Sequence, residues 1–177
     1  HKIMNEIDRL DEIGEKLIPE QDKTAKIISQ QWSSNNFIYL GMGPFYGLAC
    51  EAALKMREMA LLHSESYHPL ELRHGPKAII DASSAIFCLL SDTGRKYEVN
   101  LVKEQNNFGA KTFILCDKKQ EAEEDAAGCW LEMESGISDL SRGILYMPFL
   151  QLLAYYYSLK QGIDPDNPRN LVASVIL

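Results

Sequence analysis

Short apolar runs alternate with longer helical stretches through most of this chain. Each run is rich in aromatic and aliphatic side chains and is followed by turn residues, which is typical of a buried strand. A helix between two such strands serves as a crossover connection, which makes the strands parallel and covers both faces of their sheet. The predicted strands are residues 37–40, 85–90, 112–116 and 130–133. The pattern therefore predicts an α/β fold with a parallel sheet between two layers of helices.

The helical stretches divide the chain into a leading segment and one larger unit. In residues 1–32, isoleucine and leucine recur at helical spacing, and Pro19 predicts a break between two helices. Further helices are predicted at 45–66, 97–108 and 144–160. We expect a helical connector at 1–34 and one domain at 35–177, because 177 residues suffice for one α/β core but are few for two.

Composition narrows the possible classes of function. The net charge is −7 and no basic cluster is present, which argues against a nucleic-acid or an anionic-membrane surface. The sequence shows no membrane-spanning apolar stretch and no signal peptide. The four cysteines are widely spaced, so we expect reduced thiols, a cytoplasmic location and no metal site. The chain begins at His1 rather than Met, which favours a part of a longer protein.

The sharpest arrangement of polar side chains is Glu51-Ala-Ala-Leu-Lys55-Met-Arg-Glu58. Glu51, Lys55 and Glu58 are spaced i, i+4 and i+7, so they share one face of the predicted helix. Such a face is usually a solvated surface with a weak Glu–Lys pair. Two carboxylates around one lysine can instead provide a base of tuned pKa beside a cation for an oxyanion. The helix follows the turn 41–44, which places this face near the carboxyl ends of the strands, where ligands bind in open sheets.

Turns supply the other candidate residues. In Glu71-Leu-Arg-His74-Gly75-Pro76, the histidine precedes Gly-Pro, which favours exposure and suits proton transfer, although a lone loop histidine is more often structural. The turn Ser91-Asp92-Thr93-Gly94 follows a strand and can cradle a phosphate or simply cap a helix. Gly43 lies in the corresponding turn after the first strand. We therefore take Gly43, Ser91 and Thr93 as candidate substrate-binding residues.

In this order, these features resemble the SIS (sugar isomerase) family. The helix 51–58, the run Ser64-Glu65-Ser66-Tyr67 and the His-Gly-Pro turn are similar to the second SIS half of the isomerase domain in glucosamine-6-phosphate synthases. The segment Pro168-Arg169-Asn170-Leu171 resembles the Pro-Arg-Asn-Leu motif near that family's C-terminus. The likeness covers about residues 35–177. It implies a three-layer fold with a five-stranded parallel sheet of the flavodoxin-like kind.

The resemblance also implies an activity. A cytoplasmic enzyme of this family would interconvert ketose and aldose phosphates or amino-sugar phosphates, so a phosphorylated sugar is the expected partner. Glu58 would move a proton between C1 and C2 of the sugar through an enediol, with Glu51 and Lys55 in supporting positions. His74 would assist ring opening across the interface of a homodimer. A metal or other cofactor is not required, because a base and hydrogen-bond donors suffice for this chemistry.

Departures from the family's pattern shift the expected activity. In the synthase a lysine follows Pro-Arg-Asn-Leu and forms a Schiff base, whereas Ala173 stands here, which favours an isomerase or a deaminase. This sequence has neither a glutaminase domain nor the Ser-x-Ser-Gly-x-Thr phosphate loop of a first SIS half. Two alternatives remain: a phosphosugar sensor without catalysis, and a half that serves assembly with a degenerate pocket. The presence of both Glu58 and His74 favours the enzyme.

Overall fold

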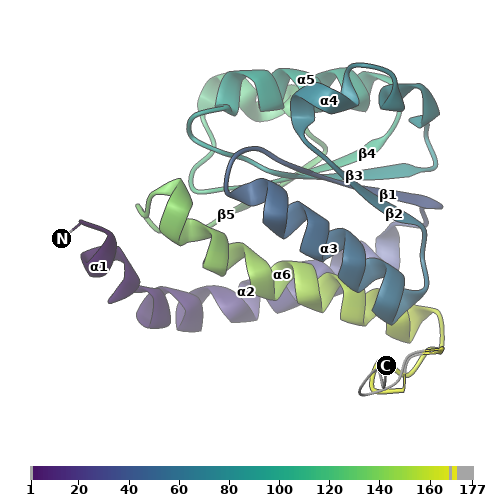
Figure 1. Cartoon of the computed structure of the whole chain (residues 1–177), viewed down its shortest axis with the longest axis horizontal. Coiled ribbons are helices and arrows are strands. Elements are labelled where there is room, and N and C mark those ends of the chain that lie inside the picture. Colours follow the sequence, from purple (N-terminus) through teal and green to yellow (C-terminus); the bar gives the residue numbers. More distant parts are fainter. Residues whose placement is uncertain (1, 168, 171–177) are drawn as a thin grey trace, which may run out of the picture.

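The structure, a computed structural model, describes residues 2–167, 169 and 170 (Figure 1). Pro168, Leu171 and Ala173 lie outside the described residues. What the sequence predicts from Ala173 about Schiff-base chemistry therefore stays a prediction.

Five parallel strands form one sheet in the order β2-β1-β3-β4-β5. The strands are β1 (Asn36–Gly41), β2 (Ser64–Tyr67), β3 (Ser84–Leu89), β4 (Lys111–Cys116) and β5 (Cys129–Glu132). The chain steps outward from β1 to β2, crosses back to β3 and proceeds to β4 and β5, which is the flavodoxin-like order. The prediction of a three-layer fold with a five-stranded parallel sheet is confirmed.

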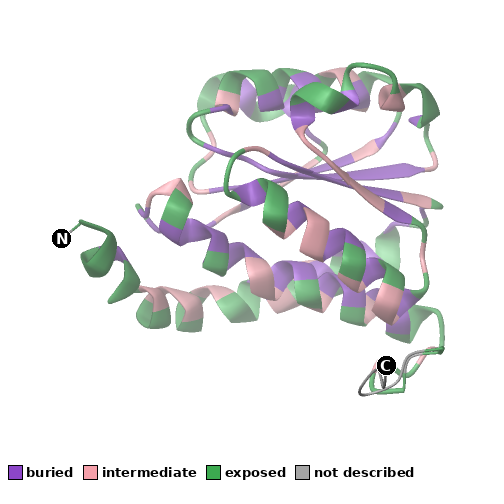
Figure 2. Cartoon of the chain, in the orientation of Figure 1, coloured by how far each residue is buried: buried purple, intermediate pink, exposed green. Residues whose placement is uncertain are grey.

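Helices cover both faces of this sheet (Figure 1). One layer, called the α3 layer below, comprises α1 (Lys2–Ile7), α2 (Leu10–Gln31), α3 (Phe45–Ala60) and α6 (Asp139–Lys160). The other, called the α5 layer, comprises α4 (Pro69–Leu72), α5 (Arg95–Asn107) and the 3-10 helices η1 (Pro76–Ile79) and η2 (Glu121–Ala126). Figure 2 shows the strands largely buried between these layers, while the helices are exposed on their outer faces.

The alternation of side chains along each strand gives the two layers different cores. In β1, Phe37 and Tyr39 face the α3 layer, whereas Ile38 and Leu40 face the α5 layer. The same alternation in β3 and β4 gathers aromatic rings on the α3 side, where Phe149 of α6 joins them. The α5 side is filled by aliphatic side chains and buried thiols instead.

The third helix is shorter than the sequence pattern indicates. It ends at Ala60, so the prediction of a helix that continues to Ser66 is wrong. Leu61 adopts a left-handed conformation with φ of 53°, which stops the helix. The following residues form the edge strand β2, in which the hydroxyl of Ser64 donates to the carbonyl oxygen of Ala53 at 2.6 Å. Sequence reasoning missed this strand because it is short and polar.

The long helix α2 runs unbroken through Pro19, so the predicted break at that residue is wrong. Pro19 lies on the exposed side of α2, and the opposite side packs against α6. Ala25 and Ile28 are buried there, and the Gln21 amide donates to the carbonyl oxygen of Leu145 at 2.7 Å. This packing outweighs the backbone hydrogen bond that proline cannot make. The segment predicted as a connector thus packs as part of the α3 layer.

The cysteines are all free thiols, as the sequence predicts. Cys88 and Cys116 are buried in β3 and β4, where burial raises the pKa of both thiols. Across the described residues, no helix combines the length and the apolarity needed to cross a membrane.

Candidate functional site

The turn after β1 sets the start of α3. A side-chain carbon on Gly41 would lie 2.2 Å from the carbonyl oxygen of Phe45, so only glycine fits there. Gly43 has a positive φ of 57°, a conformation that also favours glycine. Its carbonyl oxygen accepts a hydrogen bond from the N–H of Tyr46 at 3.2 Å. Gly43 therefore shapes the turn, and its part in substrate binding stays a prediction.

Glu51, Lys55 and Glu58 form one cluster on the outer face of α3. The ammonium nitrogen of Lys55 lies 2.9 Å from Oε2 of Glu58 and 3.5 Å from Oε1 of Glu51. About a third of each side chain is exposed: 38% for Glu51, 28% for Lys55 and 34% for Glu58. The hydrogen bond with Glu58 raises the pKa of Lys55, and the charges of both carboxylates add to this effect. Lys55 is therefore a cation at neutral pH, held between two acceptors that remain open to a ligand.

The cluster lies further from the carboxyl ends of the strands than the sequence indicates. With a rise of about 1.5 Å per residue, Glu51 lies about 9 Å and Glu58 about 20 Å along the helix axis from Phe45. Glu58 is close to Ala60, the last residue of α3, and hence near the amino ends of the strands. The candidate site is an outer helix face rather than a crevice at the sheet edge.

Polar side chains continue from this cluster toward the start of α3. Ser66 of β2 donates a hydrogen bond to the sulfur of Cys50 at 3.4 Å. The nearby Cys50 also raises the pKa of Tyr46, first through its charge and then through a hydrogen bond. Sequence reasoning did not single out these residues, although Tyr46 and Cys50 are spaced i, i+4 and Cys50 directly precedes Glu51.

His74 lies in the other layer of the molecule. It lies two residues after the end of α4, its side chain is exposed, and its backbone N–H donates to the carbonyl oxygen of Glu71 at 3.0 Å. The neighbouring Leu72 is buried in the core of the α5 layer. Glu58 belongs to α3, and Figure 1 shows α3 and α4 on opposite sides of the sheet. Within one chain, the structure does not bring His74 to the carboxylate cluster.

In the turn after β3, the hydrogen-bond donors are already bound to carboxylates of the same chain. The carboxylate of Glu98 accepts hydrogen bonds from the N–H and the hydroxyl of Ser91 at 2.9 and 2.6 Å. The N–H of Asp92 donates to both oxygens of Asp139 at 3.0 and 3.1 Å. Thr93 is exposed, while Ser91 is buried. A phosphate at this turn would have to displace Asp139, and the predicted binding role of Ser91 and Thr93 stays a prediction.

A buried arginine holds this turn in place. Arg142 of α6 is only 1% exposed, and its guanidinium lies 3.2 Å from each carboxylate oxygen of Asp92. It also bonds to Asp139 and donates to the carbonyl oxygen of Ile137 at 2.7 Å. The guanidinium carbon lies 5.7 Å from the ring centre of Phe45, a cation–π contact. Arg142 thus joins the segments that follow β1, β3 and β5.

Sequence reasoning did not single out Asp139 or Arg142. Their i, i+3 spacing at the start of a helix was the one available signal. The pairing of Arg142 with Asp92 joins residues 50 positions apart, which no local pattern reveals. In the described residues, no three histidine, cysteine, aspartate or glutamate side chains lie close enough together to share a metal ion.

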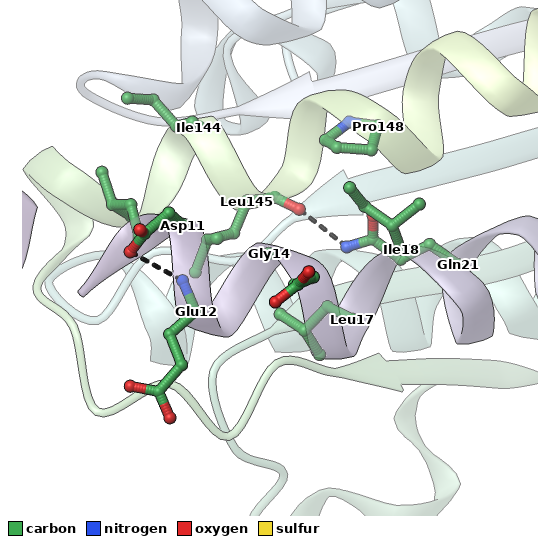
Figure 3. A pocket seen from close by; sticks show the side chains of 11 residues that line it. Asp11, Glu12, Gly14, Leu17, Ile18, Gln21, Ile144, Leu145 and Pro148 are labelled. Atoms are coloured by element: carbon green, nitrogen blue, oxygen red, sulfur yellow. Dashed lines mark hydrogen bonds between the residues drawn. The ribbon is translucent and has the colours of Figure 1, made fainter.

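A groove of about 700 Å³ lies between α2 and α6, away from these candidates (Figure 3). Its floor is apolar, with Leu17, Ile18 and Pro148 among its lining residues. Asp11, Glu12 and Glu15 also line it, and none of its lining residues in the described part of the chain is basic. Negative charge at its rim disfavours a phosphorylated ligand, so this groove is a poor candidate for a phosphosugar site.

Comparison with known proteins shows that the chain matches one protein family. The family model of the SIS domain matches residues 32–160. Glutamine–fructose-6-phosphate aminotransferase [isomerizing] from Bacteroides thetaiotaomicron is 33% identical over 174 residues, which cover 98% of this chain and 28% of that enzyme. The corresponding enzyme of Clostridium acetobutylicum is 32% identical over 176 residues, which cover 98% of this chain and 29% of the enzyme. This chain therefore spans less than a third of the length of these curated relatives.

Solved structures with the same fold come from proteins with related names. The C-terminal domain of glucosamine-fructose-6-phosphate aminotransferase from Francisella tularensis superposes with a TM-score of 0.73 at 28% identity, over 89% of this chain and 44% of that one. Glucosamine-6-phosphate deaminase from Thermotoga maritima gives a TM-score of 0.73 at 28% identity, over 96% of this chain and 50% of that one. Each superposition uses half or less of the solved chain.

Proposed function

Since the chain belongs to the SIS domain family, we propose that it carries the proton-transfer groups of a phosphosugar aldose–ketose isomerase. The observation that carries this proposal is the cluster on α3, in which one ammonium is held between two partly exposed carboxylates. The names of the relatives, an aminotransferase of fructose 6-phosphate and a deaminase of glucosamine 6-phosphate, support this substrate class. On the same support we include amino-sugar phosphates, with release of ammonia, among the proposed substrates.

In the proposed reaction the carboxylate of Glu58 takes a proton from C1 of an open-chain ketose phosphate. The electron pair of that C–H bond forms a double bond between C1 and C2, and the oxygen on C2 takes up a proton to give an enediol. The proton then returns to C2, and the oxygen on C1 loses its proton to give the aldose. Lys55 stabilises negative charge on the two oxygens, and Glu51 holds Lys55 in place. This route needs no metal or other cofactor.

We propose that a second copy of the chain supplies His74. The histidine and Glu58 lie on opposite faces of one sheet, so a homodimer is the simplest way to bring them to one substrate. There His74 would open the sugar ring: the bond between the anomeric carbon and the ring oxygen breaks, the ring oxygen takes up a proton, and the anomeric hydroxyl loses one. Histidine suits both transfers because one ring nitrogen can donate a proton while the other accepts one.

The phosphate of the substrate needs a separate binding site in this proposal. The N–H groups that Ser91 and Asp92 offer are already bound to Glu98 and Asp139. The relatives are more than three times as long as this chain, so a further region of a longer protein is the proposed source of the phosphate site. The chain alone is then expected to bind phosphosugars weakly.

The proposed chemistry is tested by proton NMR of fructose 6-phosphate and glucosamine 6-phosphate in heavy water. We expect exchange of deuterium into C1 or C2 with the unaltered chain and at least a 1,000-fold slower exchange with Glu58→Gln, while ligand binding is nearly unchanged, because the amide cannot take up the proton. Glu12→Gln is the control, since Glu12 also pairs with a lysine of its own helix, Lys16 of α2, away from the cluster. If Glu58→Gln loses binding and exchange in parallel, Glu58 is a binding group rather than the base.

The proposed dimer is tested by mixing two inactive variants. Glu58→Gln and His74→Ala are expected to be inactive alone. An equal mixture should recover about a quarter of the original activity, because half of the dimers are mixed and each of these has one intact site. No recovery after subunit exchange, shown by mass spectrometry to be complete, would place His74 in the same subunit as Glu58 or outside the site.

A further inference from the structure

The turn that carries His74 is tied to α5 through one carboxylate. Oε1 of Glu104 accepts a hydrogen bond from the ammonium of Lys77 at 2.8 Å. Oε2 of the same side chain lies 3.5 Å from the guanidinium of Arg73. Arg73 directly precedes His74 and Lys77 follows it by three residues, so Glu104 holds the turn on both sides of the histidine.

The turn has few other restraints. Its ends are fixed, because Leu72 and Ile80 are buried in the core of the α5 layer. Between them, the backbone hydrogen bonds are local, such as the bond from the N–H of Ala78 to the carbonyl oxygen of Gly75 at 2.9 Å. Gly75 has a φ of 129°, a conformation that other residues rarely adopt. Among the described residues, the side-chain hydrogen bonds and ion pairs from residues 73–79 to the rest of the chain all end on Glu104.

From this geometry we infer that Glu104 is a positioning residue, which fixes the direction in which His74 projects from the α5 layer. The inference rests on the proposed function, in which His74 opens the sugar ring. The three side chains are 30–39% exposed, and exposed ion pairs contribute little to global stability. Their main effect is therefore local, because they keep an otherwise weakly held turn in one conformation.

Loss of Glu104 should affect ring opening more than proton transfer. A loosened turn keeps His74 but lowers the fraction of time in which its ring is aligned with the substrate. We expect Glu104→Gln to lower kcat for fructose 6-phosphate by about 5- to 10-fold with little change in KM. For 5-deoxyfructose 6-phosphate, which lacks the hydroxyl that closes the ring, kcat should change less than about 2-fold, since no ring has to open.

The experiment compares Glu104→Gln with Glu124→Gln, which removes the same charge from an exposed position on η2 in the same layer. Amide hydrogen exchange, read by mass spectrometry on peptides that cover 73–79, reports the turn directly. We expect exchange there to be at least 5-fold faster in Glu104→Gln, unchanged in Glu124→Gln, and unchanged elsewhere in both variants. Kinetics with the two ketose phosphates are then measured on the same samples.

Two results would overturn the inference while the proposed function stands: unchanged exchange at 73–79 in Glu104→Gln, or an equal loss of kcat for both ketoses. The proposed function fails in a different way, namely when the unaltered chain exchanges neither C1 nor C2 hydrogens of a phosphosugar. The catalytic part of the inference then falls with it, and the exchange at 73–79 still decides whether Glu104 anchors the turn.

Discussion

The α3 layer and the α5 layer cover the same sheet but hold their candidate residues in different ways. Glu51, Lys55 and Glu58 lie on a helix of 16 residues whose inner side packs into an aromatic core. His74 lies on a turn between two four-residue helices, and that turn is held by partly exposed ion pairs. In the proposed mechanism, the base that meets one particular C–H bond therefore lies on the long, well-packed helix, and the group supplied by the proposed partner lies on the more weakly held turn.

The two cores differ in kind as well as in position. On the α3 side, Phe113 stacks on Phe149 with ring centres 5.0 Å apart and an interplanar angle of 11°. The α5 side has aliphatic packing with a buried carboxyl group, Glu98, whose Oε1 has no hydrogen-bond partner among the described residues. We therefore expect truncation of a large side chain to cost more stability in the α3 layer than in the α5 layer, and we expect the buried carboxyl group of Glu98 to make the stability of the α5 layer depend on pH.

The largest effect is expected in the aromatic core. Phe149→Ala should lower the free energy of unfolding by about 4 kcal/mol, because it removes a fully buried ring and leaves a cavity. Leu101→Ala, the matched truncation in the α5 layer, should cost about 3 kcal/mol. Urea denaturation of both variants measures the difference. A larger loss for Leu101→Ala would contradict the expectation that truncation costs more stability in the α3 layer than in the α5 layer.

The loss of Arg142, which joins the segments that follow β1, β3 and β5, is expected to have the next largest effect. Arg142→Met should cost about 3 kcal/mol at pH 7, because it leaves the mostly buried carboxylate of Asp139 without its cation. The double variant Arg142→Met/Asp139→Asn removes that unpaired charge and should recover part of the loss. If the double variant is the less stable of the two, the cost comes from lost packing around the guanidinium instead.

A pH-dependent effect of similar size is expected from Glu98 in the α5 layer. Burial raises the pKa of Glu98 from 4.5 to about 7, so between these values the folded chain keeps a proton that the unfolded chain loses. Stability should therefore fall by about 3 kcal/mol as the pH rises from about 4.5 to 7, relative to Glu98→Gln, which cannot ionise. Urea titrations at several pH values test this, with Glu121→Gln as an exposed control. Parallel pH profiles for Glu98→Gln and the unaltered chain would show that Glu98 is ionised in both states.

The smallest effects on stability are expected at the two candidate sites themselves. Lys55→Met and His74→Ala should each change the free energy of unfolding by less than about 0.5 kcal/mol, because both side chains are partly exposed. Their effects on turnover should be large, as the proposed function requires. A strong destabilisation by either substitution, seen in the same denaturation assay, would assign that residue a structural role.

The sequence allowed four of the five strands to be predicted within one residue of their bounds, because each is an apolar run. It did not reveal β2, whose four residues Ser64-Glu65-Ser66-Tyr67 carry no apolar pattern. The helix face with Glu51, Lys55 and Glu58 was predictable because helical spacing is local. The bonds of Glu104 to Lys77 and of Arg142 to Asp92 were not, since they join residues 27 and 50 positions apart.

The strict alternation in β1 has a consequence for how this chain can change in evolution. Inserting one residue inside Asn36–Gly41 would turn every following side chain of the strand to the opposite face. Tyr39 would then meet the space shaped for aliphatic groups, and Leu40 the space shaped for rings. Substitutions between similar side chains are tolerable in this strand, but changes of its length are not. Gains and losses of residues should therefore be confined to exposed segments outside the strands, where no alternation of faces has to be kept.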